Sequence, residues 1–478
     1  MSYSSPEVEH FREIRTTGNS LNAGCFVDNN QEGWSTVGVD RSQADSAFLI
    51  SGASGFAVTT TPGATWGHIY SLTVAGGHTV STDDIGNFVL VSAASSSEAY
   101  TGLFCIDAIN SVGSNTWHMT KPVRTQTANT ATYTLTARMG GAWPNLGFIE
   151  TIAGRDDWRC SAAYVKSGTY ALTTTSVNSD GGPYQPSDSN RPINIIGYNS
   201  TRGDKGVGGR PLLTVGSTGY TGTMLKARGY RGTSFQHLEI NGGGTATGGI
   251  YVDAYSIALI VDCKITNMDT SSGKAFYGRG MCLSCEASGG GDRGFHQIGA
   301  SRSVAHGVST GFYQPDYNVS NCLAYDCTTG FIFKEGNYGV TGFGNTADDC
   351  TTGFNHSGNT LANCIASNCT TGFDASSVGS GVIDGGFYNN TTNVDSDVRY
   401  NLNPITCASD PYVDASSRDY RLNTSATGGA LLADKGYGIP GQTDYRDVGA
   451  VLTEPSGSGG GGTTVPQGLH SIESGINA

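Results

Sequence analysis

Two adjacent carboxylates, Asp348 and Asp349, and one imidazole, His306, are the residues whose types best fit acid–base chemistry. Two carboxyl groups across a glycosidic bond can protonate the leaving oxygen and activate the attacking group, so these three residues are the candidates for a catalytic site. However, Asp326, Asp349 and Asn368 each stand directly before a repeated cysteine. Asp and Asn are common turn residues, so the repeat favours a structural role over a catalytic one.

Two further clusters combine charged and polar side chains that could bind a ligand. Asp292, Arg293 and His296 follow a run of three glycines, and Lys334 with Glu335 begins a second irregular stretch. We expect both stretches to be excursions from a regular scaffold, where binding residues are often carried. Loop capping explains the same residues and is the favoured interpretation.

A repeated phrase, Cys-Thr-Thr-Gly-Phe, runs through the region that must position these residues. It occurs at 327–331, 350–354 and 369–373, and a degenerate copy occupies 308–312. The glycines of the four copies are 19, 23 and 19 residues apart. Such a period is typical of one coil of a solenoid, and the short alternating phrases between copies predict brief strands joined by tight turns.

Stacked coils place equivalent side chains above one another at about 4.8 Å. The repeat therefore predicts two internal ladders, formed by Cys327, Cys350 and Cys369 and by Phe331, Phe354 and Phe373. Cysteine in such a ladder acts as a small buried apolar residue. We expect the Thr-Thr-Gly step to form a corner in which the glycine takes a positive φ angle.

The composition excludes several classes of protein. Glycine accounts for 70 of 478 residues and charged residues for 14%, which suits many short strands and not helical bundles. A net charge of −13 without a Lys/Arg stripe argues against nucleic-acid binding. No segment is long and apolar enough for membrane insertion, and the first residues lack the features of a secretory signal. We therefore expect cytoplasmic synthesis, with any extracellular role reached through an assembled virion or particle.

The twelve cysteines have ladder spacing, which favours free thiols over a disulfide framework. Cys282 and Cys285 form one CxxC pair, a weak indication of metal without a second pair. We therefore predict neither a metal nor a cofactor.

The chain divides by composition into four parts. Residues 1–136 form a smaller β-rich N-terminal module, and 137–455 form the solenoid, with a closing section at 410–451 that we expect to be a terminal cap. A Gly/Ser linker occupies 456–464, and 465–478 form a C-terminal anchoring tail. Leu469, Ile472 and Ile476 in this tail have the spacing of a small apolar helical face that would bind a partner.

The phrases at 139–144, 163–170 and 192–198 resemble the entry coils of right-handed parallel β-helix proteins of the pectin-lyase-like superfamily. The resemblance covers roughly residues 137–450 and implies an all-β, right-handed parallel β-helix. The superfamily includes polysaccharide lyases and glycoside hydrolases. Asp348-Asp349 and His306-Gly307 resemble polygalacturonase motifs, but their order is reversed and no Arg-Ile-Lys follows. The opening at 11–19 resembles the beginnings of phage-encoded β-helix proteins.

Three function classes stay open, because a fold does not decide a function. The preferred one is a phage virion structural protein, a tail spike, tail fibre or capsid decoration, whose β-helix rod serves adhesion or surface display. The alternatives are a carbohydrate-active enzyme, namely a lyase or a hydrolase acting as a depolymerase, and a self-assembling fibre or surface-layer subunit. The partners implied are other virion or fibre subunits, further copies of this chain in a homo-oligomer, and a cell-surface glycan.

Overall fold

The computed structural model describes residues 9–18, 23, 25–27, 38–44, 48–49, 56–62, 68–73, 78–93, 102–109, 116–121, 132–133, 135–144, 159–172, 194–216, 220–227, 233–253, 258–333, 342–377 and 380–433. These residues form β-strands and short 3₁₀ helices, with no α-helix among them, which confirms the predicted all-β class. Contacts group the chain into two compact units, 1–217 with 225–239, and 218–224 with 240–478. Each is described by itself.

The first unit contains an antiparallel sheet of eight strands. In spatial order these are β3 (Phe48–Leu49), β10 (Leu135–Met139), β6 (Phe88–Ala93), β7 (Gly102–Ile109), β8 (Thr116–Lys121), β5 (His68–Thr73), β4 (Phe56–Pro62) and β9 (Thr132–Tyr133). The 3₁₀ helix η1 (Thr82–Asp84) precedes β6. Asp84 in this helix is fully buried and accepts hydrogen bonds from Trp117 Nε1 at 3.0 Å and the Ser81 backbone N–H at 3.2 Å. His78 Nε2 lies 2.9 Å from the same oxygen, and Arg41 Nη2 lies 3.8 Å from the other carboxylate oxygen, so a cation also accompanies the buried charge.

The same unit also contains parallel strands. In one sheet, β1 (Glu9–Ile14) pairs in parallel with β11 (Arg159–Lys166), and β13 (Asn194–Tyr198) and β16 (Thr233–Gln236) follow in the same direction. The short strand β2 (Cys25–Val27) pairs with β1 in the antiparallel direction. Separately, β12 (Gly168–Leu172) pairs in parallel with β14 (Pro211–Val215). Fully buried Glu13 on β1 accepts hydrogen bonds from Arg15 Nε at 3.0 Å, Arg202 Nε at 2.9 Å and the Tyr198 hydroxyl. Arg202 also pairs with Asp40 at 2.7 Å. A buried carboxylate needs such partners, so this network ties β1 to the strands that follow it.

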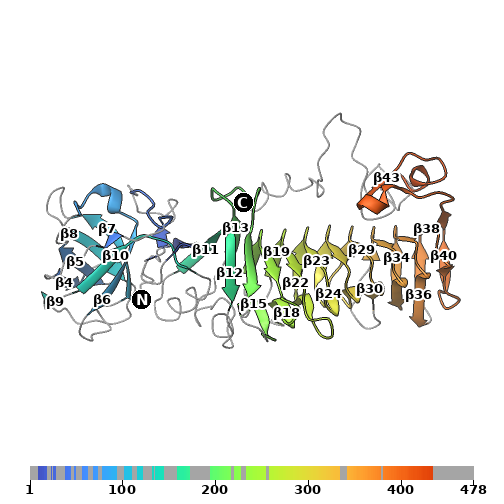
Figure 1. The fold of residues 1–478 in the computed structure, drawn as a ribbon, viewed down its shortest axis with the longest axis horizontal. Coiled ribbons are helices and arrows are strands. Elements are labelled where there is room, and N and C mark those ends of the chain that lie inside the picture. Colours follow the sequence, from blue (N-terminus) through green and yellow to red (C-terminus); the bar gives the residue numbers. More distant parts are fainter. Residues whose placement is uncertain are drawn as a thin grey trace, which may run out of the picture. The chain divides into compact units, whose positions relative to one another are not determined.

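The second unit is a parallel β-solenoid with three sheets, named here sheet 1, sheet 2 and sheet 3 (Figure 1). Sheet 1 has the order β19 (Ala258–Val261), β22 (Gly280–Leu283), β25 (Gly299–Ser301), β28 (Val319–Ser320), β31 (Gly342–Phe343), β34 (Thr360–Ala362), β37 (Gly381–Ile383) and β40 (Tyr400–Leu402). Sheet 2 has the order β20 (Lys264–Thr266), β23 (Glu286–Ser288), β26 (Val304–His306), β29 (Leu323–Tyr325), β32 (Thr346–Asp348), β35 (Ile365–Ser367), β38 (Gly386–Tyr388) and β41 (Ile405–Thr406).

Sheet 3 has the order β18 (Gly248–Val252), β21 (Lys274–Gly278), β24 (Arg293–His296), β27 (Thr310–Tyr313), β30 (Thr329–Phe333), β33 (Thr352–Ser357), β36 (Thr371–Ser377) and β39 (Thr392–Val394). Two strands, β15 (Thr223–Ala227) and β17 (Glu239–Asn241), span the division between the units.

Stacked phenylalanines fill the solenoid interior behind sheet 3. The rings of Phe331, Phe354 and Phe373 follow one another at centroid distances of 4.8 and 4.7 Å, and all three side chains are fully buried. The column continues toward the N-terminus through Phe312, Phe295 and Phe276. The cysteines Cys327, Cys350 and Cys369 are also buried, and the pKa of the Cys350 thiol is raised by Cys327 and by burial. These thiols are packing residues and not nucleophiles.

The tight corner of each coil does not use glycine as the repeat predicts. Asp326, Asp349 and Asn368 adopt the left-handed backbone conformation, with φ of 54°, 50° and 52°. Gly330 and Gly353 lie within β30 and β33 instead, where an added Cβ would come within 2.6 and 2.7 Å of a carbonyl oxygen of the next coil. The glycine is therefore required by close packing, while the preceding Asp or Asn, which tolerates a positive φ, makes the turn.

The chain after β41 folds back onto the outer face of sheet 2. This C-terminal hairpin, residues 408–433, contains β42 (Tyr412–Asp414), η3 (Ala415–Ser417), β43 (Asp419–Leu422) and η4 (Gly429–Leu431). Its buried apolar side chains are Tyr412, Tyr420, Leu422 and Leu432, and they cluster with Leu323, Tyr325 and Ile365 of sheet 2. The described part of the predicted closing cap thus covers a side of the solenoid.

Candidate functional sites on the solenoid

A cluster of aromatic and cationic side chains lies on the outer face of sheet 3, and we call it the aromatic–cation cluster. Its members are Tyr251, Lys274, Tyr277, Arg293, His296 and Tyr313. The strand register aligns Tyr251 with Tyr277, Tyr277 with His296, and His296 with Tyr313. Tyr277, His296 and Tyr313 each directly follow an inward phenylalanine of the column, and Tyr251 follows the inward Ile250. Because side chains alternate along a strand, these four residues point outward.

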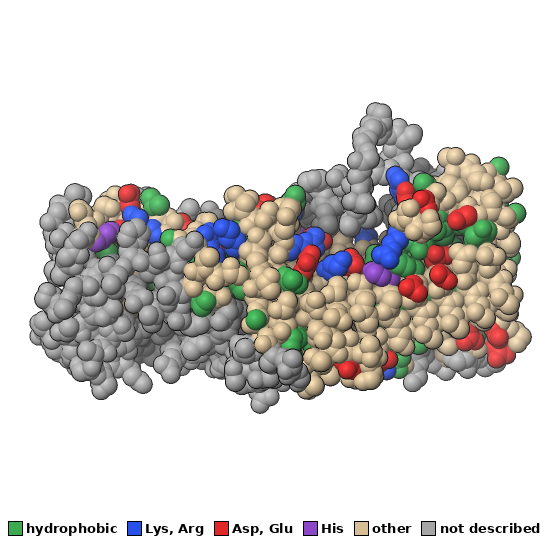
Figure 2. Space-filling model, in the orientation of Figure 1, with side chains coloured by type: hydrophobic (Ala, Val, Ile, Leu, Met, Phe, Trp, Pro, Cys, Tyr) green, Lys and Arg blue, Asp and Glu red, His purple; other side chains and the backbone are tan. Residues whose placement is uncertain are grey.

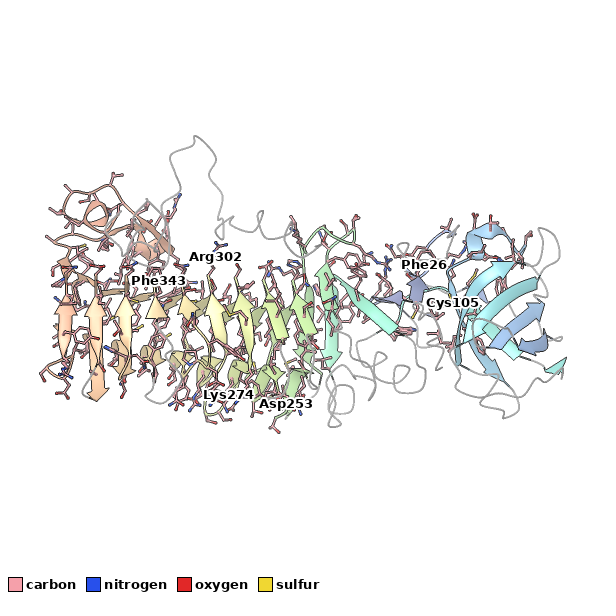
Figure 3. All side chains as sticks on the ribbon, turned by 180° about the vertical axis from the view of Figure 1, so that it is seen from behind. Phe26, Cys105, Asp253, Lys274, Arg302 and Phe343 are labelled. Carbon is pink, nitrogen blue, oxygen red and sulfur yellow. The ribbon has the colours of Figure 1, made fainter. Side chains whose placement is uncertain are left out.

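Close contacts hold the cluster together. The Arg293 guanidinium lies 3.7 Å from the centroid of the Tyr313 ring, and its Nη1 is 3.1 Å from His296 Nε2. Tyr251 and Tyr277 stack at 4.7 Å, while Lys274 Nζ lies 5.6 Å from the Tyr277 ring (Lys274 is labelled in Figure 3). Ring edges, hydroxyls and two cations therefore share one partly exposed surface. Such a surface can hydrogen-bond hydroxyls and attract an anion.

The two cations also determine the charge of the histidine between them. Burial, followed by the nearby charges of Lys274 and Arg293, lowers the pKa of His296 to about 4. His296 is therefore neutral near pH 7 and adds no positive charge of its own. Asp292 pairs with Arg293 Nε at 3.0 Å and offsets part of the guanidinium charge. Among the described residues, no carboxylate forms an ion pair with Lys274, so its charge is not offset in this way.

A second group of ionisable residues lies on the outer face of sheet 2. His306 Nε2 is 3.2 Å from Glu286 Oε1, and Lys264 Nζ is 3.0 Å from the same oxygen. The His306 ring stacks on Tyr325 at 4.6 Å, and the guanidinium of Arg418, from the C-terminal hairpin, lies 5.1 Å from the centroid of Tyr325. Figure 2 shows charged and histidine side chains gathered beside this hairpin. The hydrogen bond from His306, together with Lys264, lowers the pKa of Glu286 to about 2 despite its burial.

The candidate acid Asp348 lies beneath the hairpin. It is 4% exposed, and its Oδ1 accepts hydrogen bonds from Ser367 Oγ at 2.7 Å and Asn368 Nδ2 at 2.8 Å. Its Oδ2 accepts a third from the Tyr420 hydroxyl at 3.0 Å. Burial raises the pKa of Asp348. Because a substrate cannot reach a covered and fully hydrogen-bonded carboxyl group, we assign Asp348 to the attachment of the hairpin.

A shallow hollow of about 530 Å³ lies along the turns between sheets 2 and 3. Asp326 and Asp349 line it, and both side chains are exposed. Their coils are adjacent, so the backbones of the two residues are separated by roughly the 4.8 Å strand spacing. The floor is formed by Cys327 and Cys350, whose thiols are buried.

The structure places the candidate residues at separate positions. His306 and Asp348 share the outward column of sheet 2, on β26 and β32, whereas Asp349 lies in the following turn. The sequence suggested that Arg293 and His296 belong to an excursion, but the structure does not place them in one. They lie on the regular strand β24, because Phe295 between them belongs to the phenylalanine column. Lys334, Glu335, Leu469, Ile472 and Ile476 lie outside the described residues.

Sequence reasoning missed Lys274, Tyr251, Tyr277 and Tyr313. A signal was present, since an aromatic residue follows the inward position in 250–251, 276–277, 295–296 and 312–313. The early coils lack the Cys-Thr-Thr-Gly-Phe phrase, so their alignment with the later ones was not visible. Among the residues that the structure describes, no group of three or more His, Cys, Asp or Glu is placed to hold a metal ion. In the same residues no helix is long and apolar enough to cross a membrane.

No family model and no curated protein matches this sequence. The chain is similar in fold to three solved structures. The A-module of the Azotobacter vinelandii mannuronan C-5 epimerase AlgE4 has 11% identity and a TM-score of 0.26, covering 50% of this chain and 90% of that one. The pectate lyase Pel9A has 14% identity and a TM-score of 0.32, covering 61% and 88%.

The third structure is the catalytic domain of a GH87 α-1,3-glucanase in complex with nigerose, with 10% identity and a TM-score of 0.24, covering 82% of this chain and 93% of that one. All three likenesses concern the fold. These scores are low, and the class of the protein, a parallel β-solenoid, rests on the strand pairing of the chain itself.

Proposed function

We propose that this protein is an adhesion rod that binds an acidic glycan on the outer face of sheet 3. The observation that carries the proposal is the aromatic–cation cluster, in which tyrosine edges and hydroxyls surround Lys274 and Arg293. Tyrosine offers an apolar ring beside a hydrogen-bonding group, which suits a sugar with both C–H and hydroxyl groups. The cations favour a carboxylate or sulfate on that sugar.

The surrounding charge supports an acidic ligand more than a neutral one. The chain has a net charge of −13, so most of its surface repels polyanions. An acidic glycan is therefore expected to bind where cations are concentrated. On sheet 3 the position two residues before each column phenylalanine holds Lys274 and Arg293 in two successive coils and threonine in the coils that follow. The cluster is therefore a local exception on an acidic molecule.

The direct test is a binding titration with two oligosaccharides of equal length, one carrying carboxylates and one neutral. We expect the acidic ligand to bind more tightly and to lose affinity as salt increases, because salt screens the cations. Equal affinities without salt dependence would contradict the role of the cations. No binding of either ligand would contradict the adhesion function itself.

Display on a virion is a further part of the proposal. Its support is the sequence alone, namely the Gly/Ser linker at 456–464 and the apolar spacing in the tail at 465–478. A flexible linker lets a tail reach a partner site while the rod stays free to bind a surface. Deletion of residues 456–478 should abolish incorporation into the particle while glycan binding persists. Unchanged incorporation would remove this part of the proposal.

The hollow beside Asp326 and Asp349 supports glycan cleavage as a second candidate function. Two exposed carboxylates extend from backbones about 4.8 Å apart, a spacing that can bring them to the roughly 5–5.5 Å of retaining glycosidases. The test is the release of reducing ends from an acidic and a neutral polysaccharide by the wild type, Asp326→Asn and Asp349→Asn. Activity that either substitution abolishes would support cleavage. No activity in the wild type would leave the rod as a binder.

A further inference from the structure

The outer face of sheet 1 carries no charge, which sets it apart from the other two sheets. Its eight strands in the second unit contain no Asp, Glu, Lys or Arg. The corresponding strands of sheet 2 carry Lys264, Glu286 and Asp348, and sheet 3 carries Lys274, Arg293 and Asp374. The face of a sheet that contacts water usually carries polar and charged side chains. An uncharged face on an acidic molecule therefore needs a separate explanation.

One outward column of this face is mainly apolar. The strand register aligns Val261, Leu283, Ser301, Ser320, Phe343, Ala362, Ile383 and Leu402 in that order. Leu402 is 49% exposed, and Leu259 in the neighbouring column is 37% exposed. Figure 3 labels Phe343, whose side chain is partly exposed at the end of β31. The column thus forms an apolar stripe that polar turn residues border.

Six of the eight residues in the stripe, from Val261 to Ala362, have a self-complementary order. Ser301 and Ser320 are paired neighbours near the middle, with their hydroxyl oxygens 3.4 Å apart. A two-fold axis along the strands at this level would place Ser301 opposite Ser320 of a second copy. Leu283 would then face Phe343, and Val261 would face Ala362. Polar residues meet polar ones and apolar residues meet apolar ones, which is the requirement for an isologous interface.

The turns that border the stripe are compatible with the same pairing. Arg302 follows Ser301, and Asn321 follows Ser320, so each Arg302 would lie near the partner's Asn321. Asp262 would likewise lie near the partner's Asn363. No like charges are brought together at these positions, although two copies repel one another elsewhere because each has a net charge of −13. Apolar residues thus flank the two serines at the axis, and polar turn residues form a rim of the kind that protein interfaces usually have.

We infer that two copies of this protein associate through sheet 1 with their solenoids antiparallel, about a two-fold axis between Ser301 and Ser320. The six strands that overlap about this axis, spaced about 4.8 Å apart, and a width of about 10 Å give a face of roughly 290 Å² per copy. A stable interface buries about 800 Å² per partner. The pair is therefore weak and concentration-dependent in solution, and it strengthens with salt because salt screens the net negative charge.

The first test is sedimentation equilibrium of the full chain over a range of concentrations. We expect reversible dimers, and we expect Phe343→Asp to weaken the association at least tenfold. The matched control is Thr329→Asp, which adds the same charge to an outward position of sheet 3 and should leave association unchanged. A wild type that stays monomeric up to its solubility limit would overturn the proposal. Equal effects of the two substitutions would also overturn it.

Cross-linking tests the register independently of any charge substitution. The eleven cysteines that the structure describes are all buried, so an introduced outward thiol can be distinguished from them. A mixture of Leu283→Cys and Phe343→Cys proteins should form a disulfide-linked pair under mild oxidation, whereas neither variant alone should do so. If each variant links to itself, the solenoids are parallel and the proposed axis is wrong. If no mixture links, sheet 1 is not the interface.

Discussion

Sheets 2 and 3 of the solenoid both present tyrosine, histidine and cationic side chains outward, and within the described part of the chain it is sheet 2 whose side chains the C-terminal hairpin covers. On sheet 2 the C-terminal hairpin packs over Tyr325 and Asp348, and Tyr420 donates a hydrogen bond to the carboxylate. On sheet 3 the aromatic–cation cluster has no such cover among the described residues, and Tyr251, Lys274 and Tyr277 stay partly exposed.

Residue type alone therefore does not locate a binding site in this fold. Asp348 has the burial and raised pKa that often mark a functional acid, yet each of its hydrogen bonds comes from the protein. Lys274 has a plainer environment and remains accessible to a ligand. A satisfied polar group holds a structure together, whereas an accessible cation beside aromatic rings can bind.

The largest expected effect is the loss of the cover on sheet 2. Leu422→Ala removes a side chain that is 4% exposed in the hairpin cluster. Such truncations cost about 2–5 kcal/mol. We expect hydrogen exchange in residues 408–433 to accelerate strongly while exchange in β30, β33 and β36 stays slow. Glycan binding on sheet 3 should be unaffected, and a parallel loss of binding would show that the two faces are not independent.

A smaller effect concerns the buried carboxylate itself. Asp348→Leu leaves three donors without their acceptor and should cost about 1–3 kcal/mol. The pKa of Asp348 is higher in the folded chain than in the unfolded one, so the fold favours the protonated form. Its contribution to stability is therefore full below the unfolded pKa, near 3.9, and declines as the pH rises through the folded pKa.

Glu286 should show the opposite pH dependence. Its folded pKa is lowered to about 2, so its contribution is present above its unfolded value of 4.5 and is lost as the pH falls toward 2. Denaturant unfolding of the wild type, Asp348→Asn and Glu286→Gln between about pH 3 and 7 would separate the two groups. The Asn variant should gain stability relative to the wild type as the pH rises. A constant difference would contradict the assignment to Asp348.

Removal of the accessible cation should weaken binding with little change in stability. Lys274→Met keeps most of the side-chain length and removes the ammonium group. A charge-assisted hydrogen bond contributes about 1.5–3 kcal/mol, so we expect the affinity for an acidic oligosaccharide to fall about tenfold or more. Affinity for a neutral oligosaccharide should change little. Thr329→Ala, further along sheet 3, is the matched control and should bind as the wild type does.

The smallest effect should come from the ion pair on sheet 2. The Lys264 side chain is 39% exposed and the Glu286 side chain is 34% exposed. Pairs of this kind contribute about 0–1 kcal/mol because water and salt screen them. Lys264→Met should therefore shift the urea midpoint slightly and should leave glycan binding unchanged. A large loss of binding would move the site from sheet 3 to sheet 2.

Part of this arrangement follows directly from the sequence. The recurrence of Phe331, Phe354 and Phe373 predicts a solenoid because only stacked coils bring residues about twenty positions apart into one column. The repeat does not reveal why its glycines are needed. Gly330 avoids a contact with the next coil's backbone, while Asp326 makes the turn. Both positions hold small or polar residues of the kind found in turns. The sequence pattern therefore predicted the turn at the glycine, although the Asp or Asn before the cysteine makes it.

The candidate sites were harder to predict for a different reason. The covering of Asp348 depends on Tyr420, 72 positions later in the chain, and no local pattern indicates that the hairpin folds back onto sheet 2. Lys274 and Arg293 become neighbours only through the pairing of β21 with β24. Their coils lack the repeated phrase, so the sequence shows the residues but not their shared face.

Footprinting of the protein by hydroxyl radicals, with and without a saturating acidic oligosaccharide, tests the central claim most directly. Tyrosine side chains are readily modified when exposed, so the ligand should protect Tyr251, Tyr277 and Tyr313 on sheet 3. Tyr317, which is 46% exposed near sheet 1, should be modified equally in both samples. Protection confined to residues lining the hollow at Asp326 and Asp349, or to sheet 2, would contradict the proposed binding face.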